Sequence, residues 1–265
     1  MEIVEKQSPN CSGRGGKDIV GVILHFTAGG DSGGTVKWFM NPNSKVSAHY
    51  IVSRSGQIVR MVREEMSAWH AGSSTTTPKL NGIKGLNQKT IGIEICNWGW
   101  LFKASENAIV TVNNRTYERK PDQVYTRLRK WTYPYKGLSP AHHKVVSKVL
   151  LKSKNPFPGG DTCHFWEPYP EKQIEAVVEL LKDILSRYPN IGRQWVARHQ
   201  DVDPTRKLDT GPAFPFNDVL DQLFPVIARS DKYQIGRRPE DSVETKDMQD
   251  AYEADRCRDK WSLCQ

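Results

Sequence analysis

The sequence predicts an α/β domain in which helices flank a central β-sheet. Short, β-branched apolar runs of strand length recur along the chain, at residues 19–26, 49–62 and 90–96. Amphipathic stretches of helical length alternate with them, and the clearest spans residues 170–187. Because strands that alternate with helices favour a sheet covered by helices, we expect a central sheet with helical layers.

The first elements are a strand, a short helix and a hairpin. Residues 19–26 (IVGVILHF) are few and rich in valine and isoleucine, which favours a buried strand over a helix. Residues 35–40 (TVKWFM) indicate a short helix that ends before an Asn-Pro pair. In residues 49–62 (HYIVSRSGQIVRMV) a Ser-Gly pair separates two apolar runs, so we expect two strands joined by a turn.

Residues 90–96 (TIGIEIC) predict a further strand with two unlike faces. Strand alternation places Ile91, Ile93 and Ile95 on one face, and Gly92, Glu94 and Cys96 on the other. Beyond residues 170–187 we expect a short strand (WVAR) that leads to His199, and a last core helix at residues 217–227. Between the strand at 90–96 and the helix at 170–187, residues 97–165 are expected to be irregular, with one amphipathic stretch at residues 141–151.

The predicted domain covers residues 1–228, with an insertion at about 100–167 and a charged extension at 229–265. Residues 101–165 contain twelve lysines and arginines and four acids, which is the whole net charge of +8. A basic surface of this kind attracts a polyanion or an anionic envelope polymer. A solvated lysine-rich surface explains the same charge equally well. A nucleic-acid-binding protein would also explain it, but we expect no nucleic acid, because residues 199–209 would have no role.

The composition is that of a globular protein, with 37% hydrophobic and 26% charged residues. We expect no transmembrane segment, because no apolar run approaches the required length. The start, MEIVEKQSPN, carries two glutamates and no apolar stretch, so we expect no secretory signal. We therefore expect a protein that is made in the cytoplasm and acts either there or after release by another route.

His25, His199 and Asp209 are candidate metal ligands. Each histidine ends a predicted strand, and Asp209 follows in the loop after His199. Strand ends are where α/β sheets place ligands, and two imidazoles with a carboxylate suit a catalytic zinc site. Taken singly, each residue is more often structural, so the set matters more than its members.

Glu94 and Lys207 are candidate catalytic residues. A carboxylate in so apolar a strand requires a partner or a task, and a general base beside zinc is one such task. A buried ion pair is the alternative. Lys207 lies two residues before Asp209, where a cation would stabilise an oxyanion. The alternative for Lys207 is an ordinary surface lysine.

Seven segments spread over the chain form an ordered set of motifs. They are SPN at 8–10, VILHFTAGG at 22–30, SAHYIVSRSGQI at 47–58, WHAG at 69–72, TIGIEI at 90–95, YPEKQIEAVVELL at 169–181 and HQDVDPTRKLDTGPAFP at 199–215. Together, and in this order, they resemble the zinc-dependent N-acetylmuramoyl-L-alanine amidases, a family that includes amidase-type phage lysins, muropeptide-recycling amidases and peptidoglycan recognition proteins.

The resemblance implies a mixed β-sheet flanked by helices and cleavage of the amide between N-acetylmuramic acid and L-alanine in peptidoglycan. It implies zinc held by His25, His199 and Asp209, with Glu94 as base and Lys207 as oxyanion-stabilising cation. Ala48 stands where some phage enzymes have a catalytic tyrosine. His49 and His70 match positions that the family does not use as zinc ligands, so we expect His49 to shape the sheet, and His70 and Trp69 to line the substrate groove.

The biological use stays open at this point. A phage lysin, a cytosolic recycling amidase and an amidase effector delivered by a secretion apparatus would each lack a signal peptide. The basic insertion favours a lytic enzyme that meets anionic envelope polymers. A non-catalytic peptidoglycan-binding module would lack a metal ligand, and all three candidate ligands are present.

Overall fold

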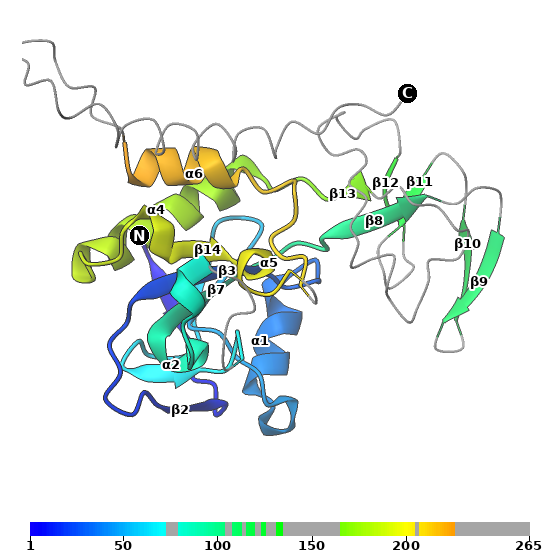
Figure 1. The fold of residues 1–265 in the computed structure, drawn as a ribbon. Coiled ribbons are helices and arrows are strands. Elements are labelled where there is room, and N and C mark those ends of the chain that lie inside the picture. Colours follow the sequence, from blue (N-terminus) through cyan, green and yellow to red (C-terminus); the bar gives the residue numbers. More distant parts are fainter. Residues whose placement is uncertain are drawn as a thin grey trace, which may run out of the picture. The chain divides into compact units, whose positions relative to one another are not determined.

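A six-stranded mixed β-sheet forms the centre of the fold (Figure 1). One pair of neighbouring strands, β5 and β4, is antiparallel, and the other four pairs are parallel. This confirms the expected α/β class with a mixed sheet. The order across the sheet is β1 (Ile3–Glu5), β5 (Ile58–Arg60), β4 (Tyr50–Val52), β7 (Thr90–Ile95), β3 (Gly21–Phe26) and β14 (Val196–Arg198).

The computed structural model describes residues 1–72, 79–103, 108–112, 115–119, 123–125, 131–134, 165–204 and 207–225. The residues up to Pro225 belong to one compact unit. The predicted amphipathic stretch at 141–151 and the C-terminal extension at 229–265 lie outside the described residues. In the described ranges, no helix is long and apolar enough to cross a membrane.

One face of the sheet is covered by two helices, α4 (Glu171–Arg187) and α6 (Phe216–Leu223) (Figure 1). Burial of apolar area between helix and sheet stabilises this layer. The buried residues of this cluster from the strands are Val22, Leu24, Tyr50, Val52, Ile58, Ile91, Ile93, Ile95 and Val196, and those from the helices include Val177, Leu181, Ile184, Val219 and Leu220.

The opposite face is covered by other helices and carries two smaller apolar clusters. These helices are α1 (Ser32–Met40), α2 (Leu86–Lys89) and α5 (His199–Val202), together with the 3-10 helices η1 (Pro42–Ser44), η2 (Lys79–Gly82) and η5 (Arg193–Trp195). Figure 1 shows α1 and α2 on the side of the sheet away from α4 and α6. The polar side chains of strands β3 and β7 lie on this face.

The boundaries of two helices differ from the expected ones. Helix α1 begins at Ser32, not at residue 35, because the carboxylate of Asp31 accepts the backbone N–H of Gly34 at 2.8 Å. The last core helix occupies Phe216–Leu223 rather than residues 217–227. Alternation in β7 is as predicted, since Ile91, Ile93 and Ile95 belong to the α4 cluster and Cys96 to a cluster on the other face.

The prediction that residues 97–165 are irregular was wrong for six segments. Tyrosine, tryptophan and valine in short runs have high β-propensity, and the proline and lysine among them hid this signal. Pairing is antiparallel in all of them. The strands are β8 (Trp100–Lys103), β9 (Ala108–Val112), β10 (Arg115–Arg119), β11 (Gln123–Tyr125), β12 (Trp131–Pro134) and β13 (Phe165–Trp166). A separate small sheet pairs β2 (Cys11–Gly13) with β6 (Met66–Ala68).

Candidate metal and catalytic centre

His25 and Glu94 stand side by side on two neighbouring strands. Strands β3 and β7 are parallel, and their register pairs His25 directly with Glu94. Val22 and Leu24 of β3 pack against the α4 layer, so alternation directs His25 to the opposite face. His25 is buried, with 2% of its surface exposed. The sheet therefore fixes the spacing between a candidate ligand and the candidate base.

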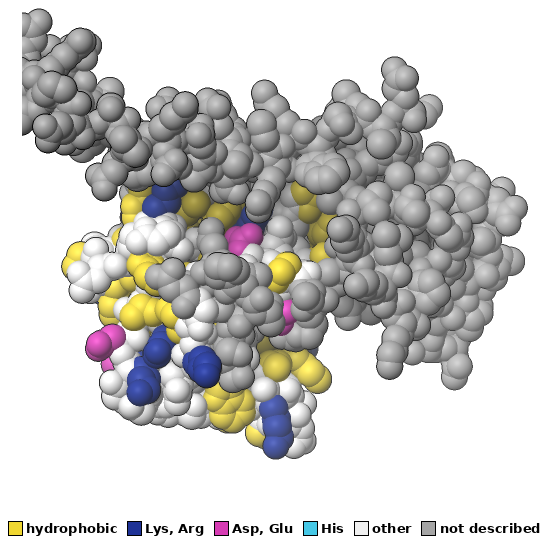
Figure 2. Space-filling model, viewed as in Figure 1, with side chains coloured by type: hydrophobic (Ala, Val, Ile, Leu, Met, Phe, Trp, Pro, Cys, Tyr) yellow, Lys and Arg dark blue, Asp and Glu magenta, His cyan; other side chains and the backbone are white. Residues whose placement is uncertain are grey.

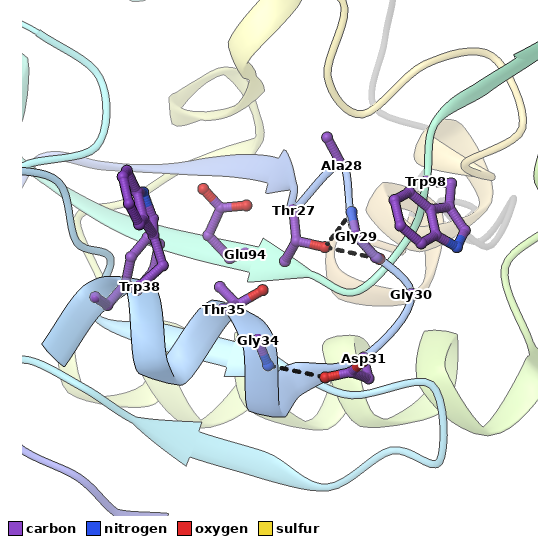
Figure 3. Close-up of a pocket in the computed structure, with 11 residues that line it drawn as sticks. Thr27, Ala28, Gly29, Gly30, Asp31, Gly34, Thr35, Trp38, Glu94 and Trp98 are labelled. Atoms are coloured by element: carbon purple, nitrogen blue, oxygen red, sulfur yellow. Dashed lines mark hydrogen bonds between the residues drawn. The ribbon is translucent and has the colours of Figure 1, made fainter. Parts of the chain in front are cut away.

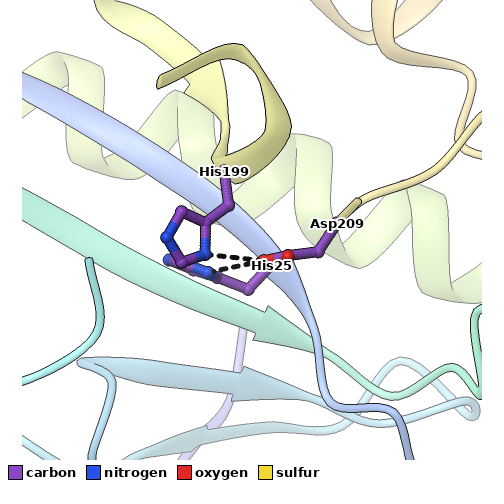
Figure 4. Close-up of side chains that lie close together, drawn as sticks. All are labelled: His25, His199 and Asp209. Atoms are coloured by element: carbon purple, nitrogen blue, oxygen red, sulfur yellow. Dashed lines mark hydrogen bonds and ion pairs between the residues drawn. The ribbon is translucent and has the colours of Figure 1, made fainter. Parts of the chain in front are cut away.

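His199 and Asp209 complete a group of three side chains (Figure 4). His199 is the first residue of α5 and directly follows β14, the strand beside β3. Asp209 approaches from the loop beyond α5. The Nδ1 atoms of His25 and His199 each lie 2.9 Å from Oδ2 of Asp209. All three residues are buried.

The electrostatics at His25 and Asp209 favour the protonation states that bind metal. Burial, and then the neighbouring His199, lower the pKa of His25 to about 4, so its imidazole is neutral near pH 7. Burial would raise the pKa of Asp209, but the interactions with His199 and His25 outweigh it and hold that pKa well below its usual range. Neutral imidazoles and an ionised carboxylate are the forms that coordinate zinc.

The donor set fits a zinc ion. One atom from each of His25, His199 and Asp209 lies within 4.8 Å of the others, close enough to share one cation. Two imidazole nitrogens and one carboxylate oxygen are a known type of zinc donor set, and three protein ligands leave a position for water or substrate. The three predicted ligands are thus brought together, although His25 is distant from the other two in the sequence.

Glu94 has the environment of a proton-transfer group. Its Oε2 is inaccessible to solvent and has no hydrogen-bond partner among the described residues. Burial, and then the charge of Asp209, raise the pKa of Glu94 well above its ordinary value, while Lys207 acts in the opposite direction. A carboxyl group with a raised pKa beside a candidate metal site is suited to take up and return a proton.

The three candidate ligands and Glu94 line a cavity of about 270 Å³. Lys207, Trp69 and His70 line the same cavity. Lys207 follows α5, and its backbone N–H donates to the carbonyl of Asp203 at 2.9 Å. The expectation that His70 lines a groove therefore agrees with the structure, and Lys207 has a position from which its charge acts on Glu94.

A second cavity of about 420 Å³ adjoins the first (Figure 3). Glu94 lines both cavities. The other walls of this second cavity are the Thr27–Asp31 loop, the start of α1, and two tryptophans, Trp38 and Trp98. Trp38 is 55% exposed. The sequence reasoning did not single out these tryptophans; their signal is the clustering of aromatic residues beside small-residue loops, which is weak without the fold.

His49 has a structural place. It is completely buried, and its Nδ1 accepts the backbone N–H of Gly92 at 3.0 Å. Burial, and then the charge of Arg14, lower the pKa of His49 to about 3. Arg14 in turn donates from Nη1 to the carbonyl of Gln88 at 2.7 Å. His49 thus helps to hold β7, as expected from its motif position.

Comparison with known proteins yields one family. The family model described as N-acetylmuramoyl-L-alanine amidase matches residues 15–212. The N-acetylmuramoyl-L-alanine amidase AmiD of Escherichia coli is 25% identical over 237 residues, which are 86% of this chain and 62% of that protein. N-acetylmuramoyl-L-alanine amidase A of Achromobacter lyticus is 46% identical over 74 residues, which are 28% of this chain and 34% of that protein.

A solved structure agrees on the fold. The crystal structure of a selenomethionine derivative of AmpD superimposes with a TM-score of 0.50 at 18% identity, covering 84% of this chain and 94% of that one. The chain spans less than two thirds of the length of the two curated amidases above, 62% and 34%.

Proposed function

Because the chain belongs to the N-acetylmuramoyl-L-alanine amidase family, we propose that it hydrolyses the amide bond between N-acetylmuramic acid and L-alanine of peptidoglycan. The observation that carries this proposal is the convergence of the His25, His199 and Asp209 donor atoms beside Glu94, a residue that lines both cavities. Such a site combines a place for a Lewis acid with a place for a base, which is what amide hydrolysis requires.

His25, His199 and Asp209 would hold zinc. A zinc ion bound there would polarise the amide carbonyl and lower the pKa of a water molecule. The three side chains approach from a strand, a helix start and a loop, so their geometry depends on the whole sheet edge. The observed fit is in the donor set and its burial, both of which match a catalytic site with an open position.

Glu94 would serve as the general base and then as the general acid. Held by β7 next to His25, it would take the proton of the attacking water and return it to the alanine nitrogen as that nitrogen leaves. Burial raises the pKa of Glu94 and so makes its carboxylate a stronger base than an exposed one, which favours uptake of the proton from water. Lys207, on the wall of the same cavity, would stabilise the negative charge that develops on the carbonyl oxygen.

The test of this function is the identity of the bond that is cut. Purified peptidoglycan is incubated with the zinc-loaded protein, and the soluble products are analysed by mass spectrometry. We expect free stem peptides that begin at L-alanine, and glycan strands whose lactyl groups end in carboxylates. New sugar reducing ends, or cleavage within the stem peptide, would contradict the proposed reaction.

We further propose a lytic role, in which the protein acts on the cell wall after release from the cytoplasm. The net charge of residues 101–165 supports this role, because lysines and arginines favour contact with anionic envelope polymers. Their side chains are not among those that the structure describes. On the face drawn in Figure 2, the lysine and arginine side chains that are described lie in separate places rather than in one patch.

Recycling of soluble muropeptides is the second candidate. The observation that favours it is a local match to the 1,6-anhydro-N-acetylmuramyl-L-alanine amidase AmpD of Enterobacter cloacae, which is 38% identical over 50 residues, 19% of this chain and 26% of that protein. An amidase effector would share the lytic substrate, so its chemistry is the same as that of the first candidate.

Charge neutralisation separates the two roles. In a variant with Arg127, Arg129 and Lys130 all changed to glutamine, we expect weaker binding to intact cell walls and a smaller salt dependence of that binding. Cleavage of a small soluble muropeptide should stay nearly unchanged. The control is a variant with three lysines changed in the domain, at Lys6, Lys17 and Lys182. Equal wall affinity and salt slope for both variants would remove the support for the lytic role.

A further inference from the structure

His25 has a second partner on the side of its ring that faces away from Asp209. Its Nε2 lies 3.0 Å from Nδ1 of His70, which comes from the segment after β6. His199, the other histidine of the group, differs: its Nε2 is buried and has no hydrogen-bond partner among the described residues. Of the two candidate histidine ligands, His25 therefore has a second imidazole, that of His70, as the hydrogen-bond partner of its Nε2.

The direction of this hydrogen bond follows from Thr90. The Thr90 hydroxyl lies 2.6 Å from the carbonyl oxygen of Leu86, which is only an acceptor, so the hydroxyl proton is committed there. Nε2 of His70 lies 3.3 Å from the same hydroxyl oxygen and therefore donates to it. A neutral imidazole carries one proton, so Nδ1 of His70 accepts, and Nε2 of His25 is the donor.

This chain of bonds leaves Nδ1 of His25 with a free lone pair. That atom lies 2.9 Å from Oδ2 of Asp209, which is also an acceptor. Two acceptors at such a distance repel each other unless a cation is shared between them. The same tautomer that follows from Thr90 and His70 is thus the one in which His25 offers Nδ1 to a metal ion.

The structure also makes room for the His70 ring. Gly92 lies on the same face of β7 as Glu94, and a Cβ atom at Gly92 would lie 2.4 Å from Cγ of His70. His70 packs edge-on against His25, with 5.2 Å between the ring centres. The backbone N–H of His70 donates to Oδ1 of Asn87 at 3.1 Å, which fixes the segment that carries the ring.

We propose that His70 is a positioning residue that accepts the Nε2 proton of His25, with Thr90 fixing its own tautomer, and so directs the Nδ1 lone pair of His25 towards the metal. This inference rests on the proposed metal centre. It assigns roles to His70 and Thr90 through their hydrogen bonds to the candidate ligand His25 and to each other. Hydrogen-bond partners of this kind orient a ligand, and their loss weakens metal binding by roughly tenfold to a hundredfold.

The test compares two residues of similar shape at position 70. In His70→Asn, the side-chain oxygen can stand where Nδ1 stands and accept from His25, whereas His70→Leu has no acceptor. The dissociation constant for zinc is measured by competition with a chromogenic chelator. We expect His70→Leu to bind zinc roughly tenfold to a hundredfold more weakly than the parent, and His70→Asn to recover most of the loss. Equal affinity of the parent, Asn and Leu forms would overturn the proposal.

Thr90 provides an independent arm in case position 70 tolerates no change. Thr90→Ser keeps the hydroxyl, and Thr90→Val keeps the shape without it. We expect weaker zinc binding for Thr90→Val only, with metal-free thermal unfolding recorded to show that both variants fold. In zinc-loaded parent protein, ¹⁵N NMR should show the His25 ring protonated at Nε2 and metal-bound at Nδ1; the reverse pattern contradicts the assignment.

These readouts do not depend on which bond the enzyme cuts. If zinc binds tightly and the His70 and Thr90 pairs differ as expected, the positioning role stands even where the peptidoglycan products contradict the proposed reaction. If the parent itself binds no zinc, the proposed metal centre fails, and this inference fails with it.

Discussion

The two faces of strands β3 and β7 differ in what they contribute. Towards α4, β7 presents Ile91, Ile93 and Ile95, all of which are completely buried among aliphatic side chains. Towards the other side, the same strand presents Gly92, with no side chain, and Glu94, whose Oε2 has no partner among the described residues. Alternate residues of a single strand thus serve packing on one side and chemistry on the other.

The fold places the residues that stabilise it and the residues of the candidate site on opposite faces of the same strands. The packed face holds the two strands together, and their register places His25 directly beside Glu94. On the chemical face, burial raises the pKa of Glu94 and lowers that of His25, which are costs that the aliphatic face offsets. Changes on the two faces should therefore have different consequences.

The largest effect is expected at the ligands on the chemical face. His25→Ala and Asp209→Ala each remove a donor atom from the three-residue group, so zinc content and activity should both be lost. Metal analysis of the purified variants measures zinc content, and we expect a single zinc ion in the parent protein analysed beside them. Full zinc occupancy in both variants would refute the ligand assignment.

A change on the packed face should do the reverse. Ile93→Ala removes buried methyl groups that contact the α4 layer and should lower the free energy of unfolding by about 2–5 kcal/mol. Below the unfolding temperature, the affinity for zinc should change little. Chemical denaturation and chelator competition on the same sample test both statements; a loss of zinc affinity comparable to that of Asp209→Ala would show that the two faces are not separable.

A smaller effect should appear in the metal-free protein as the pH rises. The pKa of Glu94 is raised in the folded state, so folding opposes its ionisation, and stability falls as pH rises from about 4.5 towards the folded pKa. Glu94→Gln cannot ionise and escapes this loss. Its melting temperature should match the parent at pH 4 and exceed it by a few degrees at pH 8. A difference that is independent of pH would show that Glu94 is not destabilised by ionisation.

Much of the fold was predictable from periodicity. The long strands, the hairpin after His49 and helix α4 follow from apolar runs and a clear amphipathic face. The strand segments of residues 100–134 were not predicted, because short strands with prolines and lysines nearby carry little periodic signal.

The residues of the candidate site were predictable, but their contacts were not. His25, His199 and Asp209 stand in recognisable motifs at strand ends, and Glu94 is conspicuous in an apolar strand. The pairing of Glu94 with His25 depends on strand register, which one sequence does not determine. The contact of His70 with His25 depends on how a loop returns over β7, and no local pattern encodes it.

The division of labour between ligands and base is the central claim, and Glu94→Gln tests it most directly. Zinc content and turnover on peptidoglycan are measured for this variant in the same assay as Asp209→Ala. We expect Glu94→Gln to retain its fold and a single zinc ion while losing turnover on the order of a hundredfold or more. Near-normal turnover with zinc in place would contradict the account, because some other group would then have to serve as the base.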